Sequence, residues 1–129
     1  ELLRRRQEAG KFPLAVLSAG ECQSPIPEKP GQGGRAAHFA LEFALEAERA
    51  GLSPYVLLSG ASDGRDGSGE AAGALLTHET LSKARKAGVR PERYLEQFDS
   101  HSFFREMGAL LPAKNTGTNV SDVRVMLTW

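Results

Sequence analysis

The sequence predicts an α/β domain with a layered α/β/α architecture and a mainly parallel or mixed central sheet. Short apolar runs bounded by glycine and proline occur at 13–18 and 55–59, as expected for buried strands. Between them, residues 35–50 carry apolar side chains at helical spacing. This strand, helix, strand order is typical of a parallel α/β unit, so we expect the two strands to be neighbours or near-neighbours in the sheet.

The first part of the chain begins like a helix already under way. Residues 1–9 have no capping residue before them, and Gly10 supplies a stop, so we expect the chain to be a piece of a longer protein. After the first strand, residues 21–27 contain two prolines, which permit an edge strand but not a central one. The long helix follows, and Gly51 ends it.

The second half of the chain is predicted to contain three short helices and a last strand. Thr77 caps the first helix, and basic residues precede Gly88 in its last turn. Pro91 suits the first position of the second helix. The predicted elements are a helix over 79–88, a helix over 91–97, a helix that is capped by Asp99 or Ser100, has Phe103, Phe104 and Met107 inward and ends with Leu110 and Leu111, and a strand over 123–128.

Length and charge narrow the class of protein. The 129 residues fit a single domain. Sixteen basic residues balance sixteen acidic ones, so nothing indicates nucleic acid or an anionic membrane as a partner. The single cysteine, Cys22, cannot form an internal disulfide, and no run resembles a signal peptide or a membrane span. We therefore expect a cytoplasmic protein with a small ligand.

Three polar, glycine-containing loops are the candidate ligand-binding segments. They cover residues 30–35, 59–70 and 114–122, each beside a regular element. Their hydroxyl, amide and carboxylate groups offer many hydrogen bonds and little packing. Ligands of open α/β sheets gather outside the carboxyl ends of the strands, so we expect the three loops to meet on one rim.

Two of these loops suggest specific chemistry. Gly31 to Arg35 opens a helix, where unpaired amides favour an anion and Arg35 adds a two-pronged donor. The alternative is a flexible connection with a surface arginine. Asp63 and Asp66 could bind a hard cation or a ligand hydroxyl, or could cap a turn. In either case we expect both aspartates to matter less for stability than for the loop or its ligand.

Six spaced segments resemble the C-terminal domain of the glycerate 2-kinase family, called the MOFRL domain, over residues 13–127. They are Ser18–Glu21, Gly31–Arg35, Ser62–Gly67, Ala71–Ala74, Asp99–Ser100 with Phe103–Phe104, and Thr116–Val120. The sequence departs from the family most clearly at Ala36-Ala37-His38, where the family usually has Asn-Gln-Glu.

The resemblance implies that residues 1–129 form one MOFRL-like domain, with 1–10 the end of an inter-domain helix, and that a larger N-terminal domain is absent. The full enzyme would transfer the γ-phosphoryl group of ATP, with magnesium, to the 2-hydroxyl of glycerate in a cleft between the two domains. Arg35 would be catalytic. The substrate- or phosphate-binding residues would be Glu21, Gly33, Gly34, Asp63, Asp66, Thr116, Thr118 and Asn119. No metal ligand is assigned, and the isolated chain is expected to be inactive.

Two other functions stay open on the sequence. The domain could be a non-catalytic binding or interaction module, if the altered residues 36–38 have removed the chemistry. It could also share the hydroxypyruvate reductase label sometimes attached to relatives, although the glycine spacing of a nicotinamide-binding fingerprint is missing.

Overall fold

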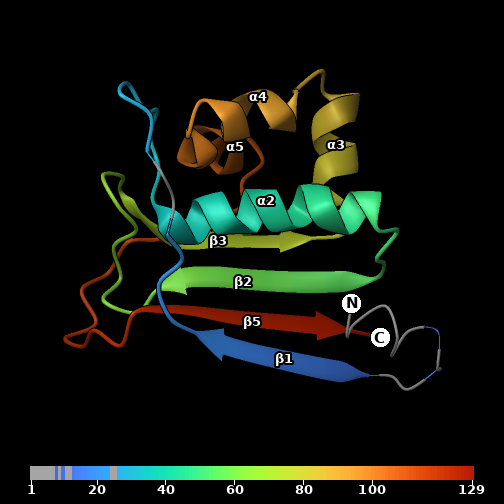
Figure 1. Ribbon diagram of the computed structural model, residues 1–129, viewed down its shortest axis with the longest axis horizontal. Coiled ribbons are helices and arrows are strands. Elements are labelled where there is room, and N and C mark those ends of the chain that lie inside the picture. The colour runs from blue at the N-terminus through green and yellow to red at the C-terminus, as the bar shows by residue number, and fades with distance from the viewer. Residues whose placement is uncertain (1–7, 9, 11–12, 24–25) are drawn as a thin grey trace.

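The structure, a computed structural model, describes residues 8, 10, 13–23 and 26–129 (Figure 1). The described residues form a mixed α/β fold, which confirms the predicted class. In chain order, the elements are β1 (Leu14–Ala19), α2 (Arg35–Arg49), β2 (Tyr55–Ala61), β3 (Ala71–Thr77), α3 (Thr80–Lys86), α4 (Pro91–Glu96), α5 (Ser100–Glu106), β4 (Leu110–Pro112) and β5 (Asp122–Thr128). The helix predicted over residues 1–9 lies outside the described residues, apart from Glu8.

The strands form one sheet in the order β1-β5-β2-β3-β4, and each hydrogen-bonded pair is antiparallel. The sheet is therefore antiparallel rather than mainly parallel. Strands β1 and β2 both run opposite to β5, so they point the same way and are near-neighbours, as predicted. Strand β5 lies between β1 and β2, so each of them pairs with an antiparallel neighbour. The predicted order of β1, α2 and β2 along the chain is unchanged.

Helix α2 covers one face of the sheet, and its buried residues are mostly alanine and leucine. Small side chains let the helix lie close to Leu57, Leu76 and Met126, which point toward it from the sheet. Helices α3, α4 and α5 pack beyond α2 on the same side (Figure 1). The core therefore lies between the sheet and this helical layer.

The other face of the sheet is apolar but is not covered by the described residues. Leu17, Val125, Leu58 and Leu75 are paired in register across four strands and so share this face. Leu17 is 72% exposed. Strand β2 carries apolar side chains toward both faces, which explains why its sequence alone reads as a strand buried on both sides.

Two strands were not predicted. Strand β3 is rich in alanine and contains Gly73, residues that are depleted in strands. A side chain at Gly73 would collide with the backbone of Ser59 in β2, so close strand pairing requires glycine there. Strand β4 is short and pairs with β3, whereas the sequence placed Leu110 and Leu111 at the end of a helix. Formation of β3 and β4 therefore depends more on pairing with neighbouring strands than on the strand propensity of their own residues.

The remaining sequence predictions have mixed outcomes. Helices α2 to α5 agree with prediction to within a few residues, and Pro91 stands in the first turn of α4. Phe103 and Phe104 are fully buried, as predicted. The edge strand considered for 21–27 is absent from its described residues, 21–23 and 26–27.

Candidate functional site

A cleft of about 450 Å³ lies at the amino-terminal end of α2. The three polar loops meet there, which confirms the predicted rim. It is lined by residues within 30–35, 61–68 and 119–122, together with Glu21, Ile26, His38, Phe98 and Ser100.

Most of the residues predicted as functional line this cleft: Glu21, Gly33, Gly34, Arg35, Asp63, Asp66 and Asn119. Thr116 and Thr118 do not. Instead, the Thr116 hydroxyl donates a hydrogen bond of 2.5 Å to the carbonyl oxygen of Ser62. The threonine thereby ties one loop of the rim to another, and contact between either threonine and a ligand stays a prediction.

Arg35 stands at the first position of α2 with its guanidinium group in the cleft. Its two terminal nitrogens approach the Glu21 carboxylate at 2.8 and 3.1 Å, a two-pronged pair. Its Nε atom lies 3.6 Å from Oδ2 of Asp122. The hydrogen bond from Arg35 lowers the pKa of Glu21 and raises that of Arg35, so both are charged at neutral pH.

Asp66 is turned away from solvent and caps α2. Its two carboxylate oxygens accept hydrogen bonds from the amides of Ala36 at 3.0 Å and Ala37 at 2.8 Å, in the first turn of the helix. Oδ2 also lies 3.1 Å from Nε2 of the buried His101. A side chain at Gly34 would collide with this carboxylate. An anionic ligand at this end of α2 would thus meet Arg35 rather than those two amides.

Asp63, in the same loop, has a different setting. It is exposed, and its Oδ1 atom accepts a hydrogen bond of 3.0 Å from the amide of Arg65. This is the turn-capping arrangement that the sequence left open. Asp63 lines the cleft, and its other carboxylate oxygen accepts no hydrogen bond from the described residues, so a ligand-binding role for Asp63 remains a prediction.

Asp122 is a cleft residue that the sequence analysis did not assign. It begins β5, is 2% exposed, and lies within 3.7 Å of both Arg35 and Arg124. Its Oδ2 atom makes no hydrogen bond among the described residues. Burial raises the pKa of Asp122, against the opposing effect of the two arginines. The only sequence signal was an acid at the junction of a polar loop and a strand.

Backbone strain also concentrates at the cleft. Among the described residues, the two non-glycine residues with positive φ are Phe98, at 52°, and Ser121, at 69°, and both line it. Such conformations cost energy and are found preferentially at functional sites. The Phe98 ring stacks on the imidazole of His38, with ring centres 4.2 Å apart. Burial lowers the pKa of His38.

The departure at residues 36–38 reaches the cleft through one side chain only. Ala36 and Ala37 are fully buried in the first turn of α2. His38 lines the cleft. Of these three residues, His38 is thus the one whose side chain could meet a ligand.

Two further kinds of site can be assessed from the residues that the structure describes. They contain no group of three or more His, Cys, Asp or Glu side chains that could hold a metal ion. In the same part of the chain, none of the helices has the length and apolar character needed to cross a membrane.

Comparisons with known proteins agree on one family. Residues 14–122 match the MOFRL family. The chain is 39% identical over 122 residues to human glycerate kinase and 35% identical over 117 residues to the D-glycerate 2-kinase of Thermotoga maritima; each match covers 91% of this chain. It is also 36% identical over 116 residues, 89% of this chain, to a proposed hydroxypyruvate reductase of Agrobacterium vitis.

A solved structure shares the fold. The crystal structure of glycerate kinase from Thermotoga maritima superposes with a TM-score of 0.86 at 31% identity, and the match covers 99% of this chain and 31% of that one. The chain also spans only about a quarter of its curated relatives: 26% of the Agrobacterium protein, 23% of the human enzyme and 27% of the Thermotoga enzyme. Most of each relative thus lies outside the matched region.

Proposed function

The chain belongs to the MOFRL family, and on this basis we propose that it forms one wall of the active-site cleft of a glycerate kinase, where ATP phosphorylates the 2-hydroxyl group of glycerate. The observation that carries the proposal is the position of Arg35, whose two-pronged donor group lies in the cleft where three polar loops meet. The other wall belongs to a larger N-terminal domain, as in the sequence-based expectation.

The groups on this wall suit the positioning of a small hydroxy acid. The planar fork of Arg35 matches either the carboxylate of glycerate or the phosphoryl group in transfer. The Ser62 hydroxyl oxygen accepts a hydrogen bond from the amide of Val120 at 2.8 Å, so its own proton remains available for a ligand oxygen. Phosphoryl transfer depends mainly on positioning and on stabilisation of charge, which these groups supply.

The wall fits one anionic group better than a triphosphate. Four carboxylates line the cleft, those of Glu21, Asp63, Asp66 and Asp122, against two arginines, Arg35 and Arg65. This balance does not favour a cluster of phosphates. Nor do the described residues supply a metal cage. We therefore assign the acid to this chain, and the nucleotide and magnesium, which a kinase would use as phosphoryl donor and charge-neutralising ion, to the other wall.

Hydroxypyruvate reductase activity, the activity named for one relative, is not supported by the loop that opens α2 in this chain. A nicotinamide-binding turn follows a strand and opens a helix. Here Gly31 to Arg35 opens α2, but no described residue between 26 and 34 belongs to a strand. We favour phosphoryl transfer for this reason, and we retain a cytoplasmic location as part of the proposal.

The proposal can be tested with a chimera in which this chain replaces the matched region of the Thermotoga maritima enzyme. We expect ATP-dependent phosphorylation of glycerate by the chimera and no turnover by the 129-residue chain alone. In the chimera, Arg35→Ala and Arg35→Lys should each lower kcat/KM on the order of a hundredfold, because lysine keeps the charge but loses the fork.

The control is Arg49→Ala, which removes an exposed arginine at the other end of α2 and should leave kcat/KM unchanged. Turnover by the isolated chain would contradict the two-wall arrangement. Unchanged kinetics in both Arg35 variants would place the active site elsewhere.

A further inference from the structure

Two of the three nitrogen donor groups of Arg35 are engaged by a carboxylate of this chain. Its two terminal nitrogens hold Glu21, at 2.8 and 3.1 Å, in the same two-pronged geometry that would bind a ligand carboxylate or phosphate. Its third donor, Nε, faces Asp122 at 3.6 Å. An anionic ligand cannot use the fork while Glu21 occupies it.

The two acids differ in how firmly they are held. The side chain of Glu21 is 56% exposed and comes from the loop that follows β1. The side chain of Asp122 is 3% exposed, and its residue is fixed at the start of β5 by pairing with Ala61 and by a hydrogen bond from the amide of Gly20 to its carbonyl oxygen. Glu21 can leave at little cost, whereas Asp122 cannot move without disturbing the sheet.

We propose that Glu21 is an internal stand-in for the ligand: its carboxylate occupies the fork of Arg35 until a carboxylate or phosphate group displaces it, while Asp122 keeps the guanidinium group directed into the cleft. This inference rests on the proposed function, since it assigns an anion to Arg35. It reverses the role expected for Glu21 from the sequence, because Glu21 competes with the ligand instead of binding it.

The contribution of each acid follows from its exposure. Exposed ion pairs are weak, so the competition from Glu21 should weaken ligand binding only roughly two- to fivefold. Asp122 acts as a positioning residue through a buried contact, and its loss should leave Arg35 free to turn away from the cleft. The lowered pKa of Glu21 keeps it ionised, and thus competing, at neutral pH.

The test is a titration of the 129-residue chain with inorganic phosphate and, separately, with D-glycerate, followed by two-dimensional NMR. Glu21→Gln should bind both anions roughly two- to fivefold more tightly than the unaltered chain. Asp122→Asn should bind them more weakly. Both variants remove one negative charge beside Arg35, so a simple charge effect would tighten binding in both. The opposite directions separate positioning from charge.

A charge-conserving variant gives a second, independent measurement. Glu21→Asp is shorter by one methylene group and should release the fork while keeping the charge, so it should also tighten binding. Glu46→Gln is the remote control, since it removes an exposed acid paired with Arg49 at the other end of α2. Thermal unfolding of each variant checks that it folds, and the Glu21→Asp result stands even if Asp122→Asn does not.

Several outcomes would overturn the inference. Weaker binding in Glu21→Gln would make Glu21 a ligand contact, and tighter binding in Asp122→Asn would leave only a charge effect. Absence of anion binding in every variant would show that the fork takes no ligand. These outcomes are distinct from failure of the proposed function. An inactive chimera would refute the proposed kinase activity. If Glu21→Gln still bound anions more tightly, the inference that Glu21 occupies the fork of Arg35 would stand.

Discussion

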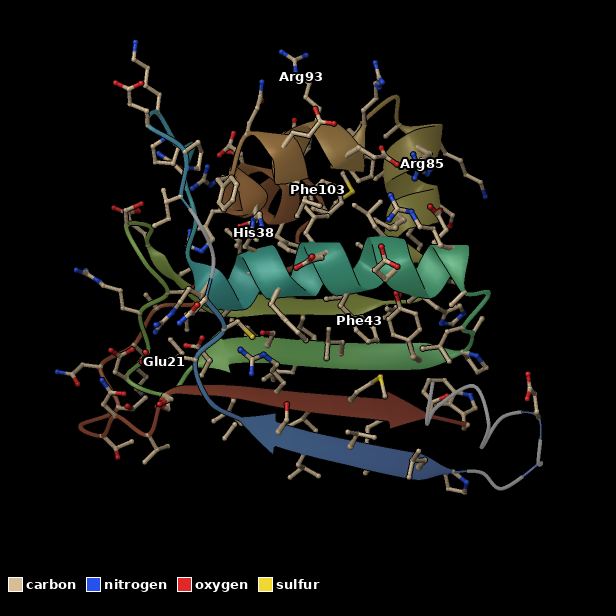
Figure 2. The ribbon with its side chains drawn as sticks, viewed as in Figure 1. Glu21, His38, Phe43, Arg85, Arg93 and Phe103 are labelled. Atoms are coloured by element: carbon tan, nitrogen blue, oxygen red, sulfur yellow. The ribbon has the colours of Figure 1, made fainter. Side chains whose placement is uncertain are left out.

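An arginine lies between two acids near each end of α2: Arg35 at its start, and Arg85 of α3 near its other end. Figure 2 shows Glu21, the partner of Arg35, near one end of the helix and Arg85 near the other. At the far end, Arg85 of α3 holds Glu48 of α2 through Nε at 3.3 Å and a terminal nitrogen at 2.8 Å. It also holds Glu92 of α4 at 3.2 and 2.5 Å. Arg85 thus ties three helices together.

The difference lies in how completely each arginine is bonded. Every donor group of Arg85 has a carboxylate within hydrogen-bonding distance, and its partners belong to helices. Arg35 has one loop partner that is exposed and one buried partner beyond hydrogen-bonding distance, and it lines a cleft. Acids beside an arginine are therefore found at both ends of α2. Incomplete bonding inside a cleft distinguishes Arg35 from Arg85.

The largest expected effect on stability comes from Asp66, because its buried carboxylate caps the cleft end of α2, which reverses the expectation from the sequence that Asp66 matters little for stability. Asp66→Ala should lower the free energy of unfolding by about 3 kcal/mol, because it leaves two helix amides and the buried His101 without their partner. Urea unfolding measures this. The matched control, Asp63→Ala, removes an exposed acid of the same loop and should change the value by less than about 0.5 kcal/mol. Equal losses would erase the distinction between the two aspartates.

A smaller effect is expected at the other end of the helix. Arg85→Ala should lower the free energy of unfolding by about 1 kcal/mol, since the pairs that it breaks are largely exposed. Phosphate binding should not change. Lys83→Ala, which breaks one exposed pair between α3 and the residue before it, Glu79, is the control and should be near neutral. If Arg85→Ala altered phosphate binding, the contrast between Arg85, which links helices, and Arg35, which is proposed to bind an anion, would fail.

The smallest effect concerns pH. Burial lowers the pKa of His38 in the folded protein, so its contribution to stability is present above the unfolded value of about 6.5 and is lost as pH falls through the folded pKa. The melting temperature should therefore fall less between pH 7.5 and 5 in His38→Gln than in the unaltered chain. An identical fall in both proteins would show that protonation of the His38 imidazole, which stacks on Phe98, does not contribute to the loss of stability at low pH.

Local sequence pattern determined much of the fold. The helical spacing over 35–50 and the apolar runs at 55–59 and 123–128 predicted α2, β2 and β5, because burial of one helix face or of a short apolar run is written in the residues themselves. The glycine-rich loops identified the rim and the family in the same way. Arg35, which lines the cleft, could be singled out from the sequence because a helix start and a two-pronged donor are both local features.

Tertiary structure alone decided the direction of the sheet, the strands β3 and β4, and the roles of three aspartates. Direction depends on which strand enters beside β1, and β5 arrives from the other end of the chain. Asp63 and Asp66 stand three residues apart in one loop, yet only Asp66 meets the amides of α2. Asp122 lines the cleft because the fold brings it beside Arg35, which lies far away in the sequence, and buries it between Arg35 and Arg124. Contacts of this kind have no local pattern, since each partner lies far along the chain.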